Sequence, residues 1–264
     1  MKKFLVIGNP INHSLSPNLH NYWFKKNNIE AIYERKKVEI SDLAKIIDKV
    51  RIDEIAGINI TVPYKQEVIN HIDILSPEAK NTSSVNTIYK ENNKIIGHNT
   101  DIAGFELAIR QTKFDIANKK ILIIGAGGVV SSIIYSLKRM KASEIGIMNR
   151  TKNKATKLKT IFKNLKLVNW GESFNFDMFI NATSVGLNKN DSLNLDFKNI
   201  EPGKFFYDLI YNPPETNFLK EARKNLHRTE NGKLMFIYQA HQAFTIWHKI
   251  MPEIDQATFN ILQL

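Results

Sequence analysis

The stretch GINITVPYK, residues 57–65, carries an amide, a hydroxyl and an ammonium group close together. Asn59 and Thr61 alternate with apolar residues, and Pro63 ends the pattern because proline has no N–H group to donate to a sheet. Such alternation is typical of a strand with one apolar and one polar face, and Lys65 follows just beyond its end. An amine held near a substrate hydroxyl can take up its proton when an alcohol is oxidised, and return it in the reverse reaction. The stretch is therefore a candidate catalytic site, although a surface lysine after a turn is the more common explanation of such a residue.

Two other polar residues stand at the expected starts of helices. Asp101 precedes IAGFELAIRQ, whose apolar spacing is helical, and Ser16 precedes Pro17 in SPNLHNYWFKKN. Ser16 is predicted to cap its helix with Pro17 in the first turn, and a hydroxyl at that end of a helix also suits a carboxylate ligand. Asp101 is likewise a good cap. The residue types alone leave a structural and a ligand-binding interpretation open at both positions.

The segment ILIIGAGGVV, residues 121–130, has the strand, glycine turn and helix start of a dinucleotide-binding site. Gly125 permits the tight turn, Gly127 lets the backbone approach a pyrophosphate, and the helix start supplies N–H donors. Val130 departs from the fingerprint, which prefers Gly or Ala at that position. The predicted cofactor contacts in this turn are Gly125, Ala126, Gly127, Gly128 and Val129.

The residues after the next expected strand, EIGIMNR, indicate which nucleotide binds. An NAD site normally has Asp or Glu there, to accept a hydrogen bond from the ribose 2′-hydroxyl. Asn149, Arg150 and Thr151 occupy this place instead, and Lys154 follows shortly after. A carboxylate would repel a 2′-phosphate, whereas guanidinium, hydroxyl and ammonium groups favour it. The sequence therefore predicts NADP as the cofactor.

Short apolar runs alternate with helical stretches along the chain, which predicts an α/β protein with mostly parallel strands. The alternation restarts at KKILIIG, and this restart predicts a second, doubly wound α/β unit. The last helical stretch, LMFIYQAHQAFTIWHKIM, is too apolar to stand alone. We expect it to pack back on another part of the chain.

Composition limits the class of protein. The chain has 264 residues, enough for one large or two ordinary domains, and it contains no cysteine, which excludes disulfides and thiolate chemistry. No segment has the apolar length of a signal-peptide core or a membrane span. The formal net charge is +11, but the lysines are spread along the chain rather than gathered among aromatic residues, which argues against nucleic-acid binding. A cytoplasmic protein without membrane contact is expected.

Taken together, these segments resemble the shikimate dehydrogenase family over essentially the whole chain. The matching segments, in order, are SLSP (14–17), NITVPYK (59–65), NT (86–87), NTD (99–101), GAGG (125–128), NRT (149–151), NATSVG (181–186), YDLIYNP (207–213) and QA (239–240). The resemblance implies NADPH-dependent, reversible reduction of 3-dehydroshikimate to shikimate without a metal. It also implies two α/β domains with a cleft between them. These are a substrate-binding domain of residues 1–102 plus 236–264 and a Rossmann-like NADP-binding domain of residues 103–235.

The resemblance carries residue roles as well. The family's catalytic pair matches Lys65 and Asp101. In the family, the serines matching Ser14 and Ser16 hold the substrate carboxylate, helped by the tyrosine matching Tyr211. The implied partners of the substrate ring hydroxyls are Asn59, Thr61, Asn86 and Gln239. The further implied cofactor contacts are Thr183, Ser184, Gly232 and Met235, although the bulky LMFIY segment around Met235 departs from the family pattern.

Several alternatives stay open at this level. Lys65 is either the base itself or a proton-relaying positioner with Asp101; we expect Lys65 to exchange the proton and Asp101 to orient it. A quinate/shikimate dehydrogenase of broader specificity would keep the same pair, and a nonenzymatic NADP-binding regulator would keep only the nucleotide site. The protein is expected to be a monomer or a homodimer. The histidines, including His13, His20 and His98, lack metal-ligand spacing and are expected to be surface or core residues.

Overall fold

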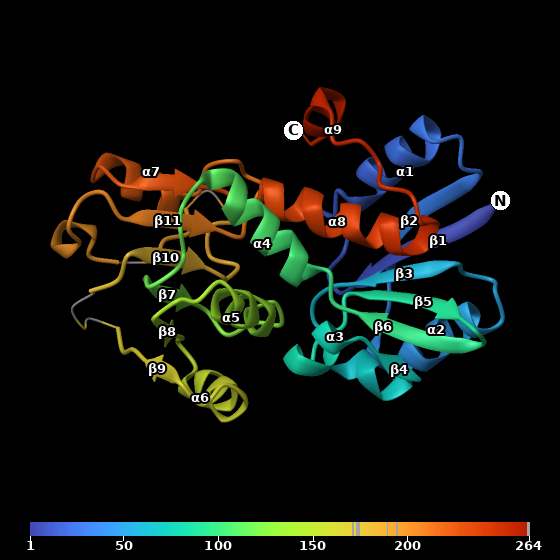
Figure 1. The fold of residues 1–264 in the computed structure, drawn as a ribbon, viewed down its shortest axis with the longest axis horizontal. Coiled ribbons are helices and arrows are strands. Elements are labelled where there is room, and N and C mark those ends of the chain that lie inside the picture. The colour runs from blue at the N-terminus through green and yellow to red at the C-terminus, as the bar shows by residue number, and fades with distance from the viewer. Residues whose placement is uncertain (171, 173–174, 189, 194, 263–264) are drawn as a thin grey trace. The chain divides into compact units, whose positions relative to one another are not determined.

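The computed structural model describes residues 1–170, 172, 175–188, 190–193 and 195–262, and it divides into two compact units. Unit 1 comprises Met1–Gly104 and Ile237–Leu264, and unit 2 comprises Phe105–Phe236. The chain passes from one unit to the other within two helices, α4 (Asp101–Thr112) and α8 (Lys233–His248). Each unit contains its own six-stranded sheet (Figure 1).

The sheet of unit 1 is mixed, with the strand order β2-β1-β3-β5-β6-β4. Its strands are β1 (Lys2–Gly8), β2 (Ala31–Lys37), β3 (Gly57–Ile60), β4 (Ile74–Leu75), β5 (Thr87–Glu91) and β6 (Lys94–His98). Strand β1 pairs in parallel with β2 and β3, whereas β5 runs antiparallel to both β3 and β6. The turn between β5 and β6 contains Asn92 and Asn93 at φ values of 48° and 58°, a left-handed conformation that asparagine tolerates well. This hairpin was not predicted from the sequence.

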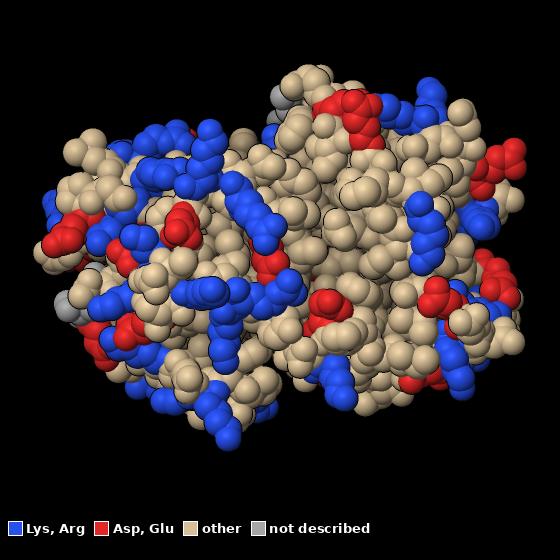
Figure 2. Space-filling model, in the orientation of Figure 1, with Lys and Arg blue, Asp and Glu red and all other residues tan. Residues whose placement is uncertain are grey.

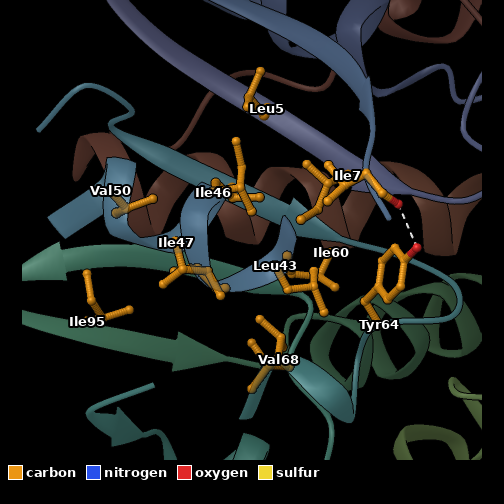
Figure 3. Packing of buried hydrophobic residues seen from close by; sticks show 14 of the residues in the cluster. Leu5, Ile7, Leu43, Ile46, Ile47, Val50, Ile60, Tyr64, Val68 and Ile95 are labelled. Carbon is orange, nitrogen blue, oxygen red and sulfur yellow. Dashed lines mark hydrogen bonds between the residues drawn. The ribbon is translucent and has the colours of Figure 1, made fainter. Parts of the chain in front are cut away.

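Helix α2 covers one face of this sheet and forms an apolar core with it. The helices of unit 1, besides α4 and α8, are α1 (Ser16–Lys26), α2 (Leu43–Arg51), α3 (Pro77–Thr82) and α9 (Gln256–Asn260). Leu43, Ile46, Ile47 and Val50 of α2 are buried together with Ile58 and Ile60 of β3 (Figure 3). Burying an aliphatic side chain of this kind contributes about 1.5–3 kcal/mol. Because Ile58 and Ile60 point into this core, the residue between them, Asn59, points to the opposite face.

The opposite face of the sheet carries Phe4, Tyr33 and Asn59 and is covered by aromatic residues of α1 and α8. Phe244 of α8 lies 5.6 Å from Phe24 of α1 between ring centroids, and Trp247 lies 4.9 Å from Phe4. The prediction that the last apolar stretch packs back on the chain is therefore confirmed. Both faces of β3 are buried, so its polar residue is enclosed rather than displayed to solvent.

The sheet of unit 2 is entirely parallel, with the strand order β12-β11-β10-β7-β8-β9. Its strands are β7 (Lys120–Ile124), β8 (Glu144–Met148), β9 (Leu165–Leu167), β10 (Met178–Asn181), β11 (Phe205–Asp208) and β12 (Arg228–Glu230). Its helices, besides α4 and the start of α8, are α5 (Val130–Arg139), α6 (Lys152–Ile161) and α7 (Asn217–Lys224). This is the order of a doubly wound dinucleotide-binding sheet, whose ligand sites lie at the strand carboxyl ends near the switch between β7 and β10. The predicted doubly wound unit is confirmed.

Charged side chains are unevenly distributed on the face shown in Figure 2. Lys and Arg are most frequent on its left-hand part, among a few acidic residues, and much of its right-hand part is uncharged. No helix in the described part of the chain is long and apolar enough to cross a membrane.

Candidate active site

Lys65 and Asp101 form a buried ion pair in unit 1. Lys65 lies shortly after the end of β3, and its carbonyl accepts a hydrogen bond of 2.8 Å from the N–H of Val85. Asp101 is the first residue of α4. The Nζ atom of Lys65 lies 2.5 Å from Oδ2 of Asp101, and the residues are only 8% and 5% exposed. The structure therefore brings together the two residues expected to be catalytic.

The second carboxylate oxygen of Asp101 has a different partner. The Asn86 amide donates to Oδ1 of Asp101 at 2.9 Å, so the two oxygens of the carboxylate are held by two different side chains. Asn86 is itself fixed, because its Oδ1 accepts from the Thr100 N–H at 2.8 Å and from the Thr87 hydroxyl at 3.0 Å. The amide of Asn86 thus orients the carboxylate that holds Lys65.

Asn59 belongs to the same hydrogen-bonded set. Its amide group donates to the Asn86 carbonyl and to Oγ1 of Thr87, both at 3.0 Å. Its Oδ1 atom accepts from the Tyr33 hydroxyl at 2.6 Å. Both amide hydrogens are therefore used within the protein, and a ligand hydroxyl can bind Asn59 only by donating to the remaining lone pair of Oδ1.

The two serines lie side by side at the start of α1. The helix begins at Ser16, Leu15 occupies the cap position, and no side-chain cap bond forms, so the prediction that Ser16 caps the helix is wrong. Instead, the Ser14 hydroxyl donates to Oγ of Ser16 at 3.2 Å. The physical reason is that Ser16 lies one residue inside the helix, where its hydroxyl turns toward Ser14 rather than back over the first turn. These hydroxyls, at the positive end of a helix, suit a carboxylate.

The other expected substrate contacts, Thr61, Gln239 and Tyr211, lie on separate segments of the chain. Thr61 is half-buried in unit 1, and its N–H donates to the Ile7 carbonyl at 2.9 Å. Gln239 is a half-buried residue of α8 within unit 1. Tyr211 belongs to unit 2, where its ring stacks on that of Phe236 at 4.5 Å between centroids.

Three residues of the hydrogen-bonded set were missed in the sequence: Tyr33, Thr87 and Thr100. Thr87 follows Asn86 in the NT segment, and Thr100 precedes Asp101 in the NTD segment. Their position beside predicted site residues is the sequence signal that could have identified them. Tyr33 carries no comparable signal, since an aromatic residue in the strand AIYERKK is ordinary. Only the pairing of β2 with β1 and of β1 with β3 brings Tyr33 toward Asn59.

In the glycine turn of unit 2, the fold requires glycine at Gly125 but not at Gly127. Gly125 has a φ of +117°, and a Cβ atom added there would lie 2.8 Å from the Ala182 carbonyl oxygen. A Cβ atom on Gly127 would meet only that oxygen, at 3.9 Å, so the fold itself does not require glycine at this position. Ala126, Gly128 and Val129 complete the turn, and Val129 occupies the cap position of α5. The turn therefore fits a group that approaches the backbone closely at Gly127, as a pyrophosphate does.

The segment after β8 lines a cavity of about 430 Å³. Asn149, Arg150 and Lys152 contribute to its wall together with Trp170. Asn149 donates from Nδ2 to the Thr151 carbonyl at 2.8 Å, which shapes this segment. Thr151 and Lys154 are exposed and are not among the lining residues, whereas Lys152 is one of them. A cavity of this size lies within the range of small-molecule sites.

The loop after β10 is organised by Asp208, at the end of β11. Asn181 donates to Oδ1 of Asp208 at 3.0 Å and accepts at its own Oδ1 from the N–H and hydroxyl of Thr183. The Thr216 hydroxyl donates to Oδ2 of Asp208 at 2.6 Å. Burial raises the pKa of Asp208 to about 6, although these hydrogen bonds oppose the shift. Thr183 is thereby fixed in the loop, and the following Ser184 is exposed.

Gly232 and Met235 stand before and within the first turn of α8. A Cβ atom at Gly232 would lie 2.1 Å from the Leu209 carbonyl oxygen, so close backbone packing already requires glycine there. Met235 is buried, with 7% exposure. The contact of either residue with a nicotinamide stays a prediction.

The histidines agree with the expected surface and core roles. His20 is fully buried and stacks on Tyr33 at 4.3 Å with an interplanar angle of 3°, and burial lowers its pKa to about 3. His13 is exposed, and His98 is half-buried. Among the residues that the structure describes, no cluster of three or more His, Asp or Glu side chains could hold a metal ion.

Comparison with known proteins places the chain among enzymes. Residues 6–88 match the family described as shikimate dehydrogenase substrate binding domain, and residues 106–186 match shikimate / quinate 5-dehydrogenase. The chain is 55% identical to the shikimate dehydrogenase (NADP(+)) of Pelagibacter ubique over 263 residues, which cover 100% of this chain and 99% of the relative.

Solved structures agree with this relationship. A shikimate dehydrogenase in complex with NADP+ is 33% identical, with a TM-score of 0.93 over 99% of this chain and 94% of that one. The shikimate 5-dehydrogenase of Thermus thermophilus in complex with NADP(H) and shikimate is 29% identical, with a TM-score of 0.89 over 99% and 97% of the two chains. The resemblance noted in the sequence is confirmed, and the chain belongs to the shikimate dehydrogenase family.

Proposed function

We propose that this protein catalyses the reversible, NADP-dependent reduction of 3-dehydroshikimate to shikimate. The single observation that carries the proposal is the buried pair of Lys65 and Asp101, held in place by Asn86. A lysine and an aspartate at this distance, enclosed in the protein and linked to further polar side chains, form a group that can exchange a proton with a substrate hydroxyl. Family membership and the glycine turn of unit 2 support the other part of the proposal, which is hydride transfer with bound NADP.

Lys65 is the proton-exchanging group in this proposal. Its ammonium form donates a proton to the carbonyl oxygen as that oxygen becomes a hydroxyl, and its amine takes the proton back in the oxidation. Asp101 keeps Nζ at a fixed position through the 2.5 Å contact, and Asn86 keeps the carboxylate from rotating. The pair therefore provides a proton donor of defined orientation.

Asn59 and the two serines position the substrate. Asn59 accepts a hydrogen bond from a ring hydroxyl through Oδ1, since its N–H groups are already used. Ser14 and Ser16 hold the carboxylate at the start of α1. Thr61, Tyr211 and Gln239 are proposed as further contacts, by the family resemblance alone.

The nucleotide site belongs to unit 2. When bound, NADPH supplies the hydride that reduces the carbonyl carbon, and NADP+ accepts it in the reverse direction. We propose that Gly127 leaves room for the pyrophosphate and that Arg150 and Lys152 contact the 2′-phosphate beside the cavity they line. Guanidinium and ammonium groups bind a phosphate dianion more strongly than a hydroxyl, so these residues favour NADP over NAD.

The test is NADPH formation by the purified protein with shikimate and NADP+, run in parallel with quinate and with NAD+. Turnover confined to shikimate and NADP+ supports both site assignments together. Turnover with quinate would retain the pair and widen the substrate class. Nucleotide binding without turnover of any substrate would instead indicate a regulator. A cytoplasmic location and a monomeric or homodimeric state are retained as predictions.

A further inference from the structure

Tyr33 binds Asn59 within the candidate substrate site of unit 1. Its hydroxyl donates to Oδ1 of Asn59 at 2.6 Å, and the nearby Ser16 side chain lowers the pKa of the same phenol, against the larger effect of burial. Ser14 in turn donates to Ser16 at 3.2 Å. The phenol of Tyr33 therefore binds Asn59 and lies near the serine pair at the start of α1.

The connection continues from Asn59 to the catalytic pair. Asn59 donates to the Thr87 hydroxyl, Thr87 donates to Oδ1 of Asn86, and Asn86 donates to Asp101, each at 2.9–3.0 Å. Asp101 accepts from Lys65 at the end of the chain. Tyr33 is thus the first link in a continuous series of hydrogen bonds that runs through Asn59 to Lys65.

Tyr33 is held through both its backbone and its ring. Asn21 of α1 donates to the Tyr33 carbonyl and accepts from its N–H, both at 2.9 Å, so the backbone of Tyr33 is clamped to the helix. His20 stacks flat on the ring, and Trp247 lies 6.2 Å from it between centroids. Tyr33 is 1% exposed, and its burial raises the pKa of the phenol well above its ordinary value. The phenol therefore stays protonated and acts as a donor of fixed direction.

We propose that Tyr33 is a positioning residue for the shikimate reaction, one that sets the direction in which Asn59 accepts a substrate hydroxyl. The phenol occupies one lone pair of Oδ1, and the two N–H groups are bound by Asn86 and Thr87, so a single acceptor position remains for the ligand. Tyr33 acts through Asn59 and not on the reacting atoms. The inference rests on the proposed function, since it assigns a role within the same site.

The test compares Tyr33→Phe, which removes only the hydroxyl, with Tyr64→Phe as a matched control. The Tyr64 hydroxyl also donates to a buried oxygen at 2.6 Å, that of the Val38 carbonyl, but it lies in the apolar core on the α2 side of the sheet (Figure 3). We expect Tyr33→Phe to raise the KM for shikimate about tenfold, with less than a threefold change in kcat and none in the KM for NADP; a tenfold change equals about 1.4 kcal/mol. The control should leave the KM for shikimate within twofold of the parent.

A double-mutant cycle distinguishes positioning from a general loss of packing. In an Asn59→Ala background, Tyr33→Phe should change the KM for shikimate by less than twofold, because the group through which it acts is absent. A tenfold effect that persists in this background, or a KM within twofold of the parent in the single variant, overturns the proposal.

A second readout does not depend on activity. In the ligand-free protein, the side-chain amide resonances of Asn59 should shift in Tyr33→Phe and stay in place in Tyr64→Phe. If the parent protein does not oxidise shikimate but the resonances shift as expected, the proposed function fails while the link between Tyr33 and Asn59 stands. Unchanged Asn59 resonances in Tyr33→Phe contradict the link itself.

Discussion

Lys65 and Asp101, 36 residues apart in the chain, meet at 2.5 Å between Nζ and Oδ2 in an enclosed part of unit 1. The contact depends on two independent features, the turn that follows β3 and the start of α4. Asp101 bridges Lys65 and Asn86, one through each carboxylate oxygen. A structural ion pair at the surface would have no need of the second bond, because solvent would supply it.

Replacing Arg150 by Ala should weaken NADP binding far more than NAD binding. Hydrogen bonds to charged groups contribute about 1.5–3 kcal/mol, so we expect a rise of roughly 10- to 100-fold in the Kd of NADP and less than threefold in that of NAD. Titration calorimetry with both nucleotides measures this. Lys159→Ala, near the other end of α6, is the control and should alter neither value. Equal losses for both nucleotides would show that Arg150 does not read the 2′-phosphate.

The two glycines of the nucleotide turn should respond differently to alanine. Gly127→Ala should fold with a nearly unchanged melting temperature but bind NADP at least tenfold more weakly, because its new methyl group has room in the protein and none beside a pyrophosphate. Gly125→Ala should be destabilised by more than about 1–2 kcal/mol, since its φ is positive and its methyl group meets the Ala182 carbonyl. Thermal unfolding and NADP titration of both variants test the distinction. Normal NADP binding by Gly127→Ala would contradict the assignment of the turn.

His20 should make unit 1 sensitive to acid. Its pKa is about 3 in the folded state and about 6.5 in the unfolded state, so the folded state binds fewer protons. The stability that this difference provides is complete above pH 6.5 and is lost as the pH falls toward 3. At pH 5 the loss is about 2 kcal/mol.

The variant His20→Phe keeps an aromatic ring and removes the titration. Its free energy of unfolding should therefore fall less than that of the parent between pH 8 and pH 5, by about 2 kcal/mol. The difference is measured by urea unfolding at both pH values, with hydrogen exchange in peptides of unit 1 as the readout. Identical pH dependence in parent and variant would mean that His20 is not held neutral.

Asp208 should make unit 2 less stable as the pH rises, which is the opposite of the effect of His20 on unit 1. Burial raises its pKa from 3.8 to about 6, so the folded state holds the proton more tightly than the unfolded state does. Its contribution is most favourable below pH 4 and is lost as the pH rises through 6, by about 3 kcal/mol. In Asp208→Asn this loss should disappear, since the amide is uncharged and Oδ1 can still accept from Asn181 and Ile210. Between pH 4.5 and pH 7.5 the loss should be about 2 kcal/mol, measured by hydrogen exchange in unit 2 peptides. A parent and variant that lose stability in parallel would contradict the assignment.

Periodicity and turn chemistry were enough to predict much of the fold. The parallel sheet of unit 2 follows from apolar strands alternating with helices, and Gly125 at a positive φ is where the fingerprint requires it. The hairpin of unit 1 was missed because its turn uses Asn92 and Asn93 in place of a glycine. Asparagine reaches the left-handed region less often than glycine does, so ENNK is a weaker turn signal.

The candidate site was predictable only in part. Lys65 and Asp101 stand in distinctive segments, whereas Tyr33 lies in an ordinary strand and gains its role from the pairing of three strands. The type of Ser16 and the proline after it predict a helix cap, but helix α1 begins at Ser16 itself. Tertiary contacts of this kind depend on register, which local sequence patterns do not specify.

The most direct test of the central claim is the kcat for shikimate oxidation by Lys65→Ala. We expect a fall of about 10²- to 10⁴-fold, the usual contribution of a positioned proton-transfer group, with an unchanged Kd for NADP. Lys90→Ala is the control, because Lys90 pairs with Asp53 at 2.6 Å on the surface of the same unit and should leave kcat unchanged. Near-normal turnover by Lys65→Ala would contradict its role in proton exchange.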